Sequence, residues 1–212
     1  MLSPIQKDVL IEILNVHIGL AASLLSEMVN QKIVLSVPEV ELTVGLDTDL
    51  NKVEQSSGLK YDQMVMSQIK FGSEFKGNAF IIFPTDKAKI LVKACLGEDI
   101  ISESSHKAEK LTADDYDVIK EICNIILNSI IGEFGNLLNV KLEYTTPEID
   151  FALISSFDKS NILPKGINVL IIHTSFLLAD SKVEGIILIA LTLDSTKMIV
   201  DKIDEMLEEI NG

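Results

Sequence analysis

The stretch "DVLIEILN" at residues 8–15 returns as "DVIKEICN" at residues 117–124, and this repeat decides how the chain is organised. Both copies read Asp-Val-x-x-Glu-Ile-x-Asn, and the second begins 109 residues after the first (117 − 8). A fixed offset between similar stretches is the signature of a repeated structural unit. We therefore expect the two copies to take equivalent places in two related halves of the protein.

The repeat extends over most of the chain. The stretch "GNAFIIFPTD" (77–86) aligns with "GIILIALTLD" (185–194) at an offset of 108, and a helix-like segment follows each of them. Other residues correspond at the offset of 109: Ser3 with Thr112, Asn30 with Asn139, Lys32 with Lys141, Pro38 with Pro147, and Glu39 with Glu148.

Each half begins with the signals of a long helix. Ser3 is a good N-cap, Pro4 suits the first turn, and Gln6 stands three residues after the cap, as in a capping box. Thr112 and Asp115 repeat this arrangement in the second half. We expect long helices over residues 4–30 and 113–139.

Strands follow each long helix. We expect them over 32–46 and 140–154, interrupted near Pro38 and Pro147, and such a proline indicates either an edge strand or a bulge. Apolar runs predict further strands at 64–71, 79–83, 168–173 and 185–193, and short helices close the halves at 86–96 and 194–210.

These elements predict an α+β fold in which long helices pack on a largely antiparallel sheet. We expect a single domain over 1–212, made of repeat 1 (about 1–105) and repeat 2 (about 106–212). The boundary falls in the polar stretch 97–115. By analogy with symmetric dimers, the two homologous halves are expected to join their strands around a pseudo-two-fold axis.

Composition narrows the class of protein. The chain has 212 residues, 47% of them hydrophobic, and a net charge of −14. It contains lysine but no arginine. Such an acidic chain repels nucleic acid and anionic membranes.

Cys95 and Cys123 lack CxxC spacing and are expected to be reduced, buried thiols of a cytoplasmic protein. No basic, signal-like start is visible, and the polar residues within 9–29 argue against a membrane span.

Asp8, Glu12 and Asn15 lie four and three residues apart, so they share one face of the first helix. We expect this polar stripe to face solvent. It is either an ordinary surface face or a functional site; its recurrence at identical spacing favours the second. A carboxylate can bind a cation, and an amide can orient a water, which suits hydrolysis by positioning. The pattern fits neither a di-metal bundle nor a nucleophilic triad.

At these residues the chain resembles the CheC-type chemotaxis phosphatases, the group of CheC, CheX and FliY, and two copies in this length look most like CheC. Their signature is Asp/Ser-x3-Glu-x2-Asn-x22-Pro. The first copy here is Asp8, Glu12, Asn15 and Pro38, and the second is Asp117, Glu121, Asn124 and Pro147.

The resemblance implies a phosphatase that hydrolyses the aspartyl phosphate of a CheY-type response regulator. Glu12 and Glu121 would dock on a lysine of the regulator, and Asn15 and Asn124 would position the attacking water. Pro38 and Pro147 would shape the strand after the helix, and Asp8 and Asp117 would support the helix face. Mg²⁺ belongs to the regulator, so no metal or cofactor of its own is expected, and CheD, a receptor deamidase, is a further partner to consider.

Other interpretations stay open. A non-catalytic adaptor that binds the regulator or CheD would keep the fold, and a structural repeat protein outside signalling is a third. Leu14 and Cys123 stand where the family carries glycine, and we expect their bulk to narrow the regulator's approach. Replacing an exposed Asn15 or Asn124 with alanine should cost no more than about 0.5 kcal/mol of stability.

Overall fold

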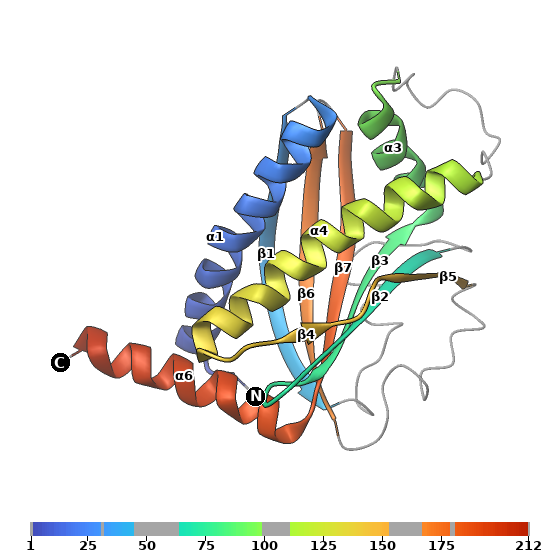
Figure 1. The fold of residues 1–212 in the computed structure, drawn as a ribbon. Coiled ribbons are helices and arrows are strands. Elements are labelled where there is room, and N and C mark those ends of the chain that lie inside the picture. The colour runs from blue at the N-terminus through green and yellow to red at the C-terminus, as the bar shows by residue number, and fades with distance from the viewer. Residues whose placement is uncertain are drawn as a thin grey trace.

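The computed structural model describes residues 2–30, 32–44, 64–98, 111–152, 167–178 and 181–211. Their fold is α+β, as expected, and the helices begin and end within one residue of the predicted positions (Figure 1). The strands expected at 168–173 and 185–193 are longer than predicted, and the strand expected over 140–154 is two short strands. In chain order the elements are α1 (Pro4–Val29), β1 (Ile33–Val44), β2 (Met64–Gly72), β3 (Gly77–Pro84), α3 (Thr85–Leu96), α4 (Ala113–Leu138), β4 (Glu143–Tyr144), β5 (Glu148–Ala152), β6 (Asn168–Leu178), β7 (Ser181–Leu191) and α6 (Leu193–Asn211).

The described strands form one antiparallel sheet whose order is symmetric. The order is β1-β6-β7-β3-β2-β4, and β5 also pairs with β2. The outer strand of each half therefore pairs with the second strand of the other half. Exchanging equivalent strands between the halves reproduces the same order read from the opposite edge, which is what a two-fold axis through the sheet requires.

The pairing of β3 with β7 locates this axis. Phe80 lies opposite Leu188 in the register of the two strands. These two residues are also equivalents at the offset of 108 in the sequence. Only on a two-fold axis does a residue face its own equivalent, so the pseudo-two-fold axis passes through this pair. The predicted relation between the two halves is confirmed.

Local hydrogen bonds explain why the long helices begin where they do. At the start of α1, the Ser3 N–H donates to Gln6 Oε1 at 2.8 Å, and the Gln6 N–H donates to Ser3 Oγ at 3.3 Å. Thr112 and Asp115 form the same capping box at α4, at 2.6 and 3.3 Å. Both boxes satisfy N–H groups that the first helical turn leaves without a partner.

The ends of the long helices are also equivalent. Asn30 and Asn139 adopt the left-handed conformation, with φ of 50° and 53°. Asparagine tolerates this conformation better than most residues do and commonly ends helices in it. The match of these two asparagines in the sequence therefore has a backbone cause.

The helices pack on one face of the sheet and build the main core there (Figure 1). Leu10, Leu14 and Ile18 of α1 are fully buried, while alternate strand residues such as Phe80 and Leu188 form a second cluster on the opposite face. Where α1 meets α4, His17 Nε2 lies 2.9 Å from Glu133 Oε1.

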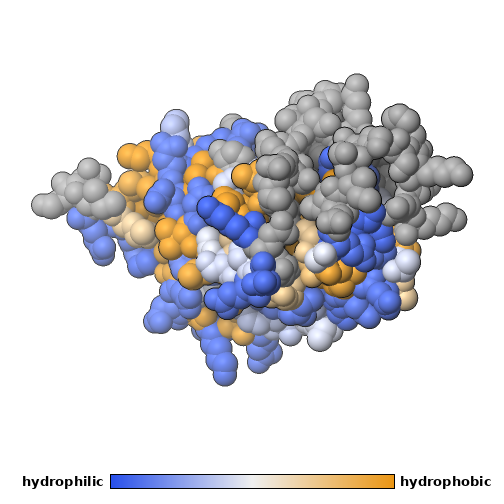
Figure 2. All heavy atoms as spheres, turned by 90° about the horizontal axis from the view of Figure 1, so that it is seen from above, coloured by the Kyte–Doolittle hydropathy of each residue, from blue (hydrophilic) through white to orange (hydrophobic). Residues whose placement is uncertain are grey.

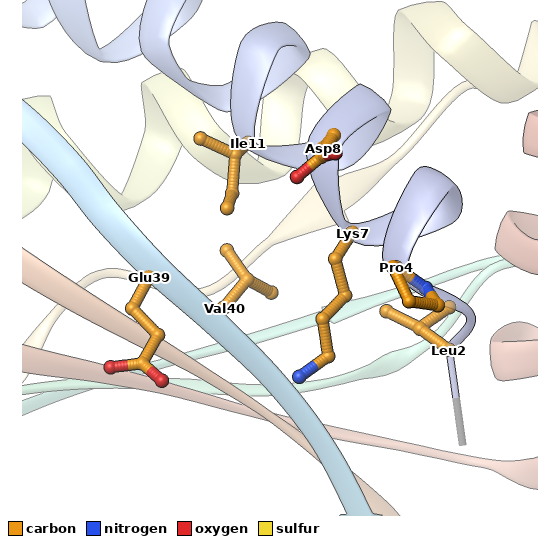
Figure 3. A pocket seen from close by; sticks show the side chains of 7 residues that line it. All are labelled: Leu2, Pro4, Lys7, Asp8, Ile11, Glu39 and Val40. Carbon is orange, nitrogen blue, oxygen red and sulfur yellow. The ribbon is translucent and has the colours of Figure 1, made fainter.

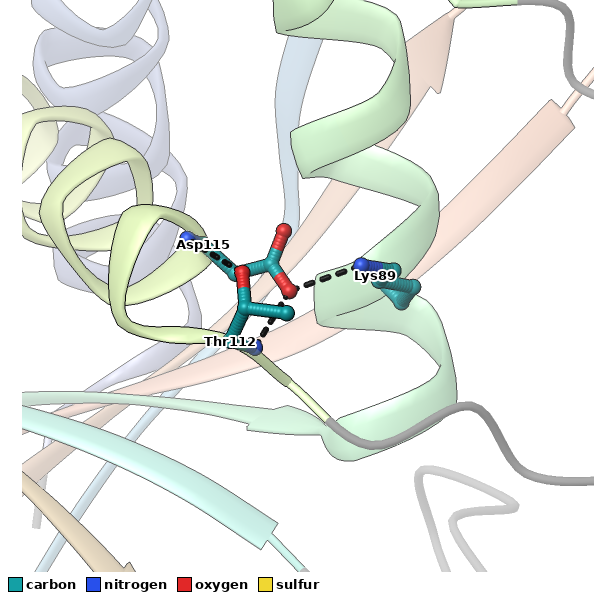
Figure 4. A network of polar contacts seen from close by, with 3 residues as sticks. All are labelled: Lys89, Thr112 and Asp115. Atoms are coloured by element: carbon teal, nitrogen blue, oxygen red, sulfur yellow. Dashed lines mark hydrogen bonds and ion pairs between the residues drawn. The ribbon is translucent and has the colours of Figure 1, made fainter.

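The third residue of α4 also ties this helix to α3. Lys89 Nζ donates to Asp115 Oδ2 at 2.7 Å, and the same oxygen accepts the Thr112 N–H (Figure 4). Burial acts to raise the pKa of the Asp115 carboxyl, but the bonds from Lys89 and Thr112 outweigh it and hold the pKa below its ordinary value of 3.8.

Asp115→Ala should therefore lower the free energy of unfolding at neutral pH by about 2–3 kcal/mol, because it removes a helix cap and a charge-assisted bond. A lowered pKa in the folded state means that the stabilisation is present above 3.8 and is lost as the pH falls through the lowered value. Urea unfolding of both proteins along a pH series measures this. Exposed Asp114→Ala is the control, and a deficit that persists unchanged at acid pH would contradict the assignment.

Candidate functional site

The first copy of the motif is held against the sheet by its asparagine. Asn15 is half-buried, and its Oδ1 accepts the Val37 N–H at 2.8 Å while its Nδ2 donates to the Val37 carbonyl at 3.2 Å. One side-chain amide thus satisfies both backbone groups of one residue of β1. Val37 directly precedes Pro38, so the structure brings together two motif residues that are separated by 22 positions.

A β-bulge explains why Val37 needs this partner. The pairing of β1 with β6 shifts between Ser36 and Glu39, so Val37 and Pro38 stand outside the ladder. Proline has no N–H to satisfy, but Val37 is buried and does. Asn15 supplies the hydrogen bonds that the neighbouring strand omits. Both expectations for the proline, an edge strand and a bulge, hold for β1.

The expectation that Asn15 is exposed is therefore wrong. Asn15→Ala should lower the free energy of unfolding by about 1–3 kcal/mol, because a buried N–H and a buried carbonyl lose their partner. Asn124→Ala is the matched comparison and should cost about 0.5 kcal/mol or less. Equal losses in the two variants by urea unfolding would contradict the structural role of Asn15.

The second copy is arranged differently. Asn124 is half-buried, and its Oδ1 accepts a hydrogen bond at 2.7 Å from Asn128 Nδ2, one turn further along α4. Within the described residues, no other hydrogen bond engages the Asn124 side chain. Thr146, the equivalent of Val37, is exposed, so water can satisfy its backbone.

Thr145 closes the second bulge. The Thr145 N–H donates to the Lys70 carbonyl, and the Lys70 N–H donates to Thr145 Oγ1, both at 2.9 Å. Three residues lie between Tyr144 of β4 and Glu148 of β5, whereas two lie between their partners Phe71 and Gln68 on β2. Pro147 is buried at this interruption. Asn124 is therefore not needed to hydrogen-bond the backbone of the bulge, as Asn15 is in the first half.

The motif carboxylates face solvent in both halves. Asp8, Glu12, Asp117 and Glu121 are exposed, and none of them has an ion-pair or hydrogen-bond partner within the described residues. The structure does not bring the two copies together, because the N-terminal parts of α1 and α4 lie toward opposite ends of the helix layer (Figure 1). Each copy is a separate candidate site.

A groove lies beside the first copy, between the start of α1 and β1 (Figure 3). Its volume is about 400 Å³. Lys7 reaches from α1 toward the strand, whereas Glu39 turns its carboxylate away from the helix. The side chains that line it are Leu2, Pro4, Lys7, Asp8, Ile11, Glu39 and Val40.

Leu14 and Cys123 lie in the core, which corrects the expectation that they narrow the approach of a partner. Both side chains are fully buried on the inner faces of α1 and α4. Burial raises the pKa of the Cys123 thiol to about 12 and that of half-buried Cys95 to about 11. Neither thiol is a nucleophile at neutral pH.

A line of exposed apolar side chains continues along α1 from the first motif. Val16, Leu20, Leu24 and Met28 follow Glu12 at intervals of four and are 57%, 57%, 53% and 44% exposed. We call these four residues the α1 row. Seen from above, hydrophobic side chains gather on the side of the molecule where α1 lies (Figure 2). Val16 and Leu20 are as apolar as the buried residues of α1, so their exposure is known only from the packed structure.

Of the described helices, α1 has one stretch, Pro4–Met28, that is long and apolar enough to cross a membrane. It also packs on β1 and α4 through fully buried leucines and isoleucine, as a core helix does.

One group of side chains has the composition of a metal site. Ligand atoms of Glu39, Glu41 and His173 all lie within 4.8 Å of one another, because His173 faces Glu39 across the β1–β6 pair. These residues are far apart in the sequence, so only the strand register could reveal the group. Exposed acidic groups gather in this way without a metal, and we assign none.

The fold matches solved structures of FliY, FliM and the chemotaxis protein CheX over most of the chain. FliY of Thermotoga maritima is 16% identical with a TM-score of 0.73, and the match covers 97% of this chain and 98% of that chain. CheX of Desulfovibrio desulfuricans is 16% identical with a TM-score of 0.50, covering 85% of this chain and 99% of that chain. The chain has the CheC/CheX/FliY family fold.

FliM shares this CheC/CheX/FliY fold. In the FliM–SpeE complex of H. pylori, the match is 12% identical with a TM-score of 0.65 and covers 97% of each chain. No family model matches the sequence. The match covers 98% of the solved FliY chain, so the length of this chain does not distinguish a CheC-like protein from a FliY-like one.

Proposed function

We propose that the protein is a phosphatase that hydrolyses the aspartyl phosphate of a CheY-type response regulator in chemotaxis or two-component signalling. The observation that carries this proposal is the second motif copy, in which half-buried Asn124 lies one helical turn from exposed Glu121. Among the residues that the structure describes, neither the N–H groups of Asn124 nor the Glu121 carboxylate has a partner. The recurrence of this motif in two halves of a CheC/CheX/FliY fold supports it.

The chemistry needs little from this chain beyond positioning. Water attacks phosphorus, the bond between phosphorus and the aspartate oxygen breaks, and the electron pair returns to the aspartate carboxylate. The proton of the water leaves with the phosphate product. Mg²⁺ on the regulator would neutralise the phosphoryl oxygens, and this chain would supply geometry.

Each motif residue has a distinct task in this proposal. Glu121 would pair with a lysine of the regulator, and Asn124 would hold the water. An amide offers two N–H groups and two lone pairs on its oxygen. Asn128 occupies one lone pair of Asn124, so three positions remain for water and phosphoryl oxygens.

In the first copy, Asn15 has fewer free hydrogen-bonding groups than Asn124 has. Val37 occupies one lone pair and one N–H group of Asn15. Glu12 is exposed like Glu121, so docking at α1 keeps its carboxylate. We therefore propose that both copies can bind a regulator and that the copy on α4 turns over faster.

The test follows the decay of a phosphorylated CheY-type regulator with and without the protein, in the presence of Mg²⁺. Wild type should accelerate phosphate release, and Glu12→Ala with Glu121→Ala should abolish the acceleration without unfolding the chain. Glu143→Ala, which removes an exposed carboxylate outside both motifs, is the control for net charge. An unchanged decay with wild type, across several regulators from the same genome, would refute the phosphatase proposal.

A second candidate function is a non-catalytic adaptor in the same system, binding a regulator or CheD. The α1 row favours it, because four apolar side chains in line on a helix suit burial against a partner. FliM, with the same fold, was solved in complexes with FliG and with SpeE. An adaptor would bind the regulator while leaving phosphate release unchanged, and Leu20→Ser with Leu24→Ser would weaken that binding.

A further inference from the structure

The side chain of Asn128 is only half satisfied. Its Nδ2 donates to Asn124 Oδ1 at 2.7 Å, but its own Oδ1 is buried without a hydrogen-bond partner within the described residues. A buried acceptor without a partner destabilises the folded state, and leucine or alanine would suit this helical position better. Stability alone therefore gives no reason for an asparagine here.

The equivalent position in the first half makes the contrast plain. Gly19 stands there, at the offset of 109, and a Cβ added to it would meet nothing within 4 Å. Asn15 needs no partner on its own helix, because β1 already holds its amide in a fixed orientation. Asn124 lacks that strand contact, and Asn128 provides the orienting bond instead.

We propose that Asn128 is a positioning residue for Asn124. Its bond occupies the Asn124 oxygen and thereby turns the N–H groups of Asn124 toward the solvent-facing side of α4, where a phosphorylated regulator would dock. This inference rests on the proposed function for its effect on rate, but the orientation of Asn124 is a property of the free protein. A group that orients another in this way typically changes activity by about 10–100-fold when it is removed.

Asn128→Leu tests the inference, because it removes the donor and the unsatisfied acceptor while it keeps the size of the side chain. Turnover of the phosphorylated regulator should fall about tenfold, KM should stay within about twofold, and the melting temperature should be unchanged or higher. The half-buried neighbour Ser129→Ala is the control and should leave turnover unchanged.

A double-mutant cycle separates positioning from a merely structural role. If Asn128 acts through Asn124, then Asn128→Leu in an Asn124→Ala background should change the rate by less than about twofold. Equal losses in both backgrounds would overturn the inference, and so would an unchanged rate in the single variant.

Nuclear magnetic resonance of the free protein gives an answer that needs no activity. Asn128→Leu should shift the side-chain NH₂ signals of Asn124 and leave those of Asn15 in place. If wild type proves inactive but these signals move as expected, the proposed function fails while the orienting bond stands. If the Asn124 signals do not move, Asn128 does not position Asn124, whatever the activity.

Discussion

In a Glu12→Ala background, which disables the copy on α1, Asn124→Ala should slow the hydrolysis of a phosphorylated CheY-type regulator by about 100-fold while it leaves the protein folded. The expected size follows from the loss of a fixed group that holds the reacting water, which typically costs about 10²–10³ in rate. Because the side chain of Asn124 hydrogen-bonds only to Asn128 within the described residues, its removal should hardly change the free energy of unfolding. Single-turnover decay of the phosphorylated regulator, with urea unfolding of the same samples, measures both quantities.

Asn15→Ala is the comparison that makes this result informative. It should lose more stability than Asn124→Ala but less activity, because Asn15 holds the bulge of β1 and the copy on α4 stays intact. A larger loss of rate from Asn15→Ala, measured on protein shown to be folded, would reverse the proposed ranking of the two sites.

Gly77→Ala should lower the free energy of unfolding by about 3 kcal/mol or more. Gly77 begins β3 opposite Leu191 of β7, and a Cβ there would collide with the carbonyl oxygen of Ala190 and lie 2.9 Å from the ring of Phe71. The carbonyl belongs to the central strand pair, so it cannot move without disturbing the pairing around the pseudo-two-fold axis.

Gly19→Ala is the matched control, since it is the same substitution in open space. It should raise the free energy of unfolding by about 0.5–1 kcal/mol, because alanine favours the helix more than glycine does. Urea unfolding of the two variants should therefore give changes of opposite sign. A mild effect of Gly77→Ala, below about 1 kcal/mol, would contradict the close approach of β3 and β7.

Gly185 is the equivalent of Gly77 and meets the same restriction from the other half. A Cβ there would lie 2.7 Å from the ring of Phe83, the residue that corresponds to Leu191. The glycine that opens both "GNAFIIFPTD" and "GIILIALTLD" is thus explained by the lack of room for a Cβ beside the central strand pair, next to the Ala190 carbonyl at Gly77 and the Phe83 ring at Gly185. The sequence repeat alone did not reveal this cause.

Local sequence signals account for the helices and strands and for their symmetry. Capping boxes at Ser3 and Thr112 and the left-handed asparagines at Asn30 and Asn139 depend on contacts within a few residues, so local chemistry fixes them. The repeat then requires equivalent strands in both halves, and the exposed glutamates Glu12 and Glu121 followed from helical periodicity.

The contacts of each asparagine depend on how the sheet and helices pack. Asn15 and Asn124 stand at the same position of the repeated motif. Val37, near Asn15, is buried and needs a hydrogen-bond partner, whereas its equivalent Thr146 is exposed and can bind water. Residue type likewise does not show that Leu14 faces the core while Leu20 faces solvent. A hydrogen bond to a strand far along the chain depends on which backbone groups the packed sheet leaves without partners, and no local pattern encodes that.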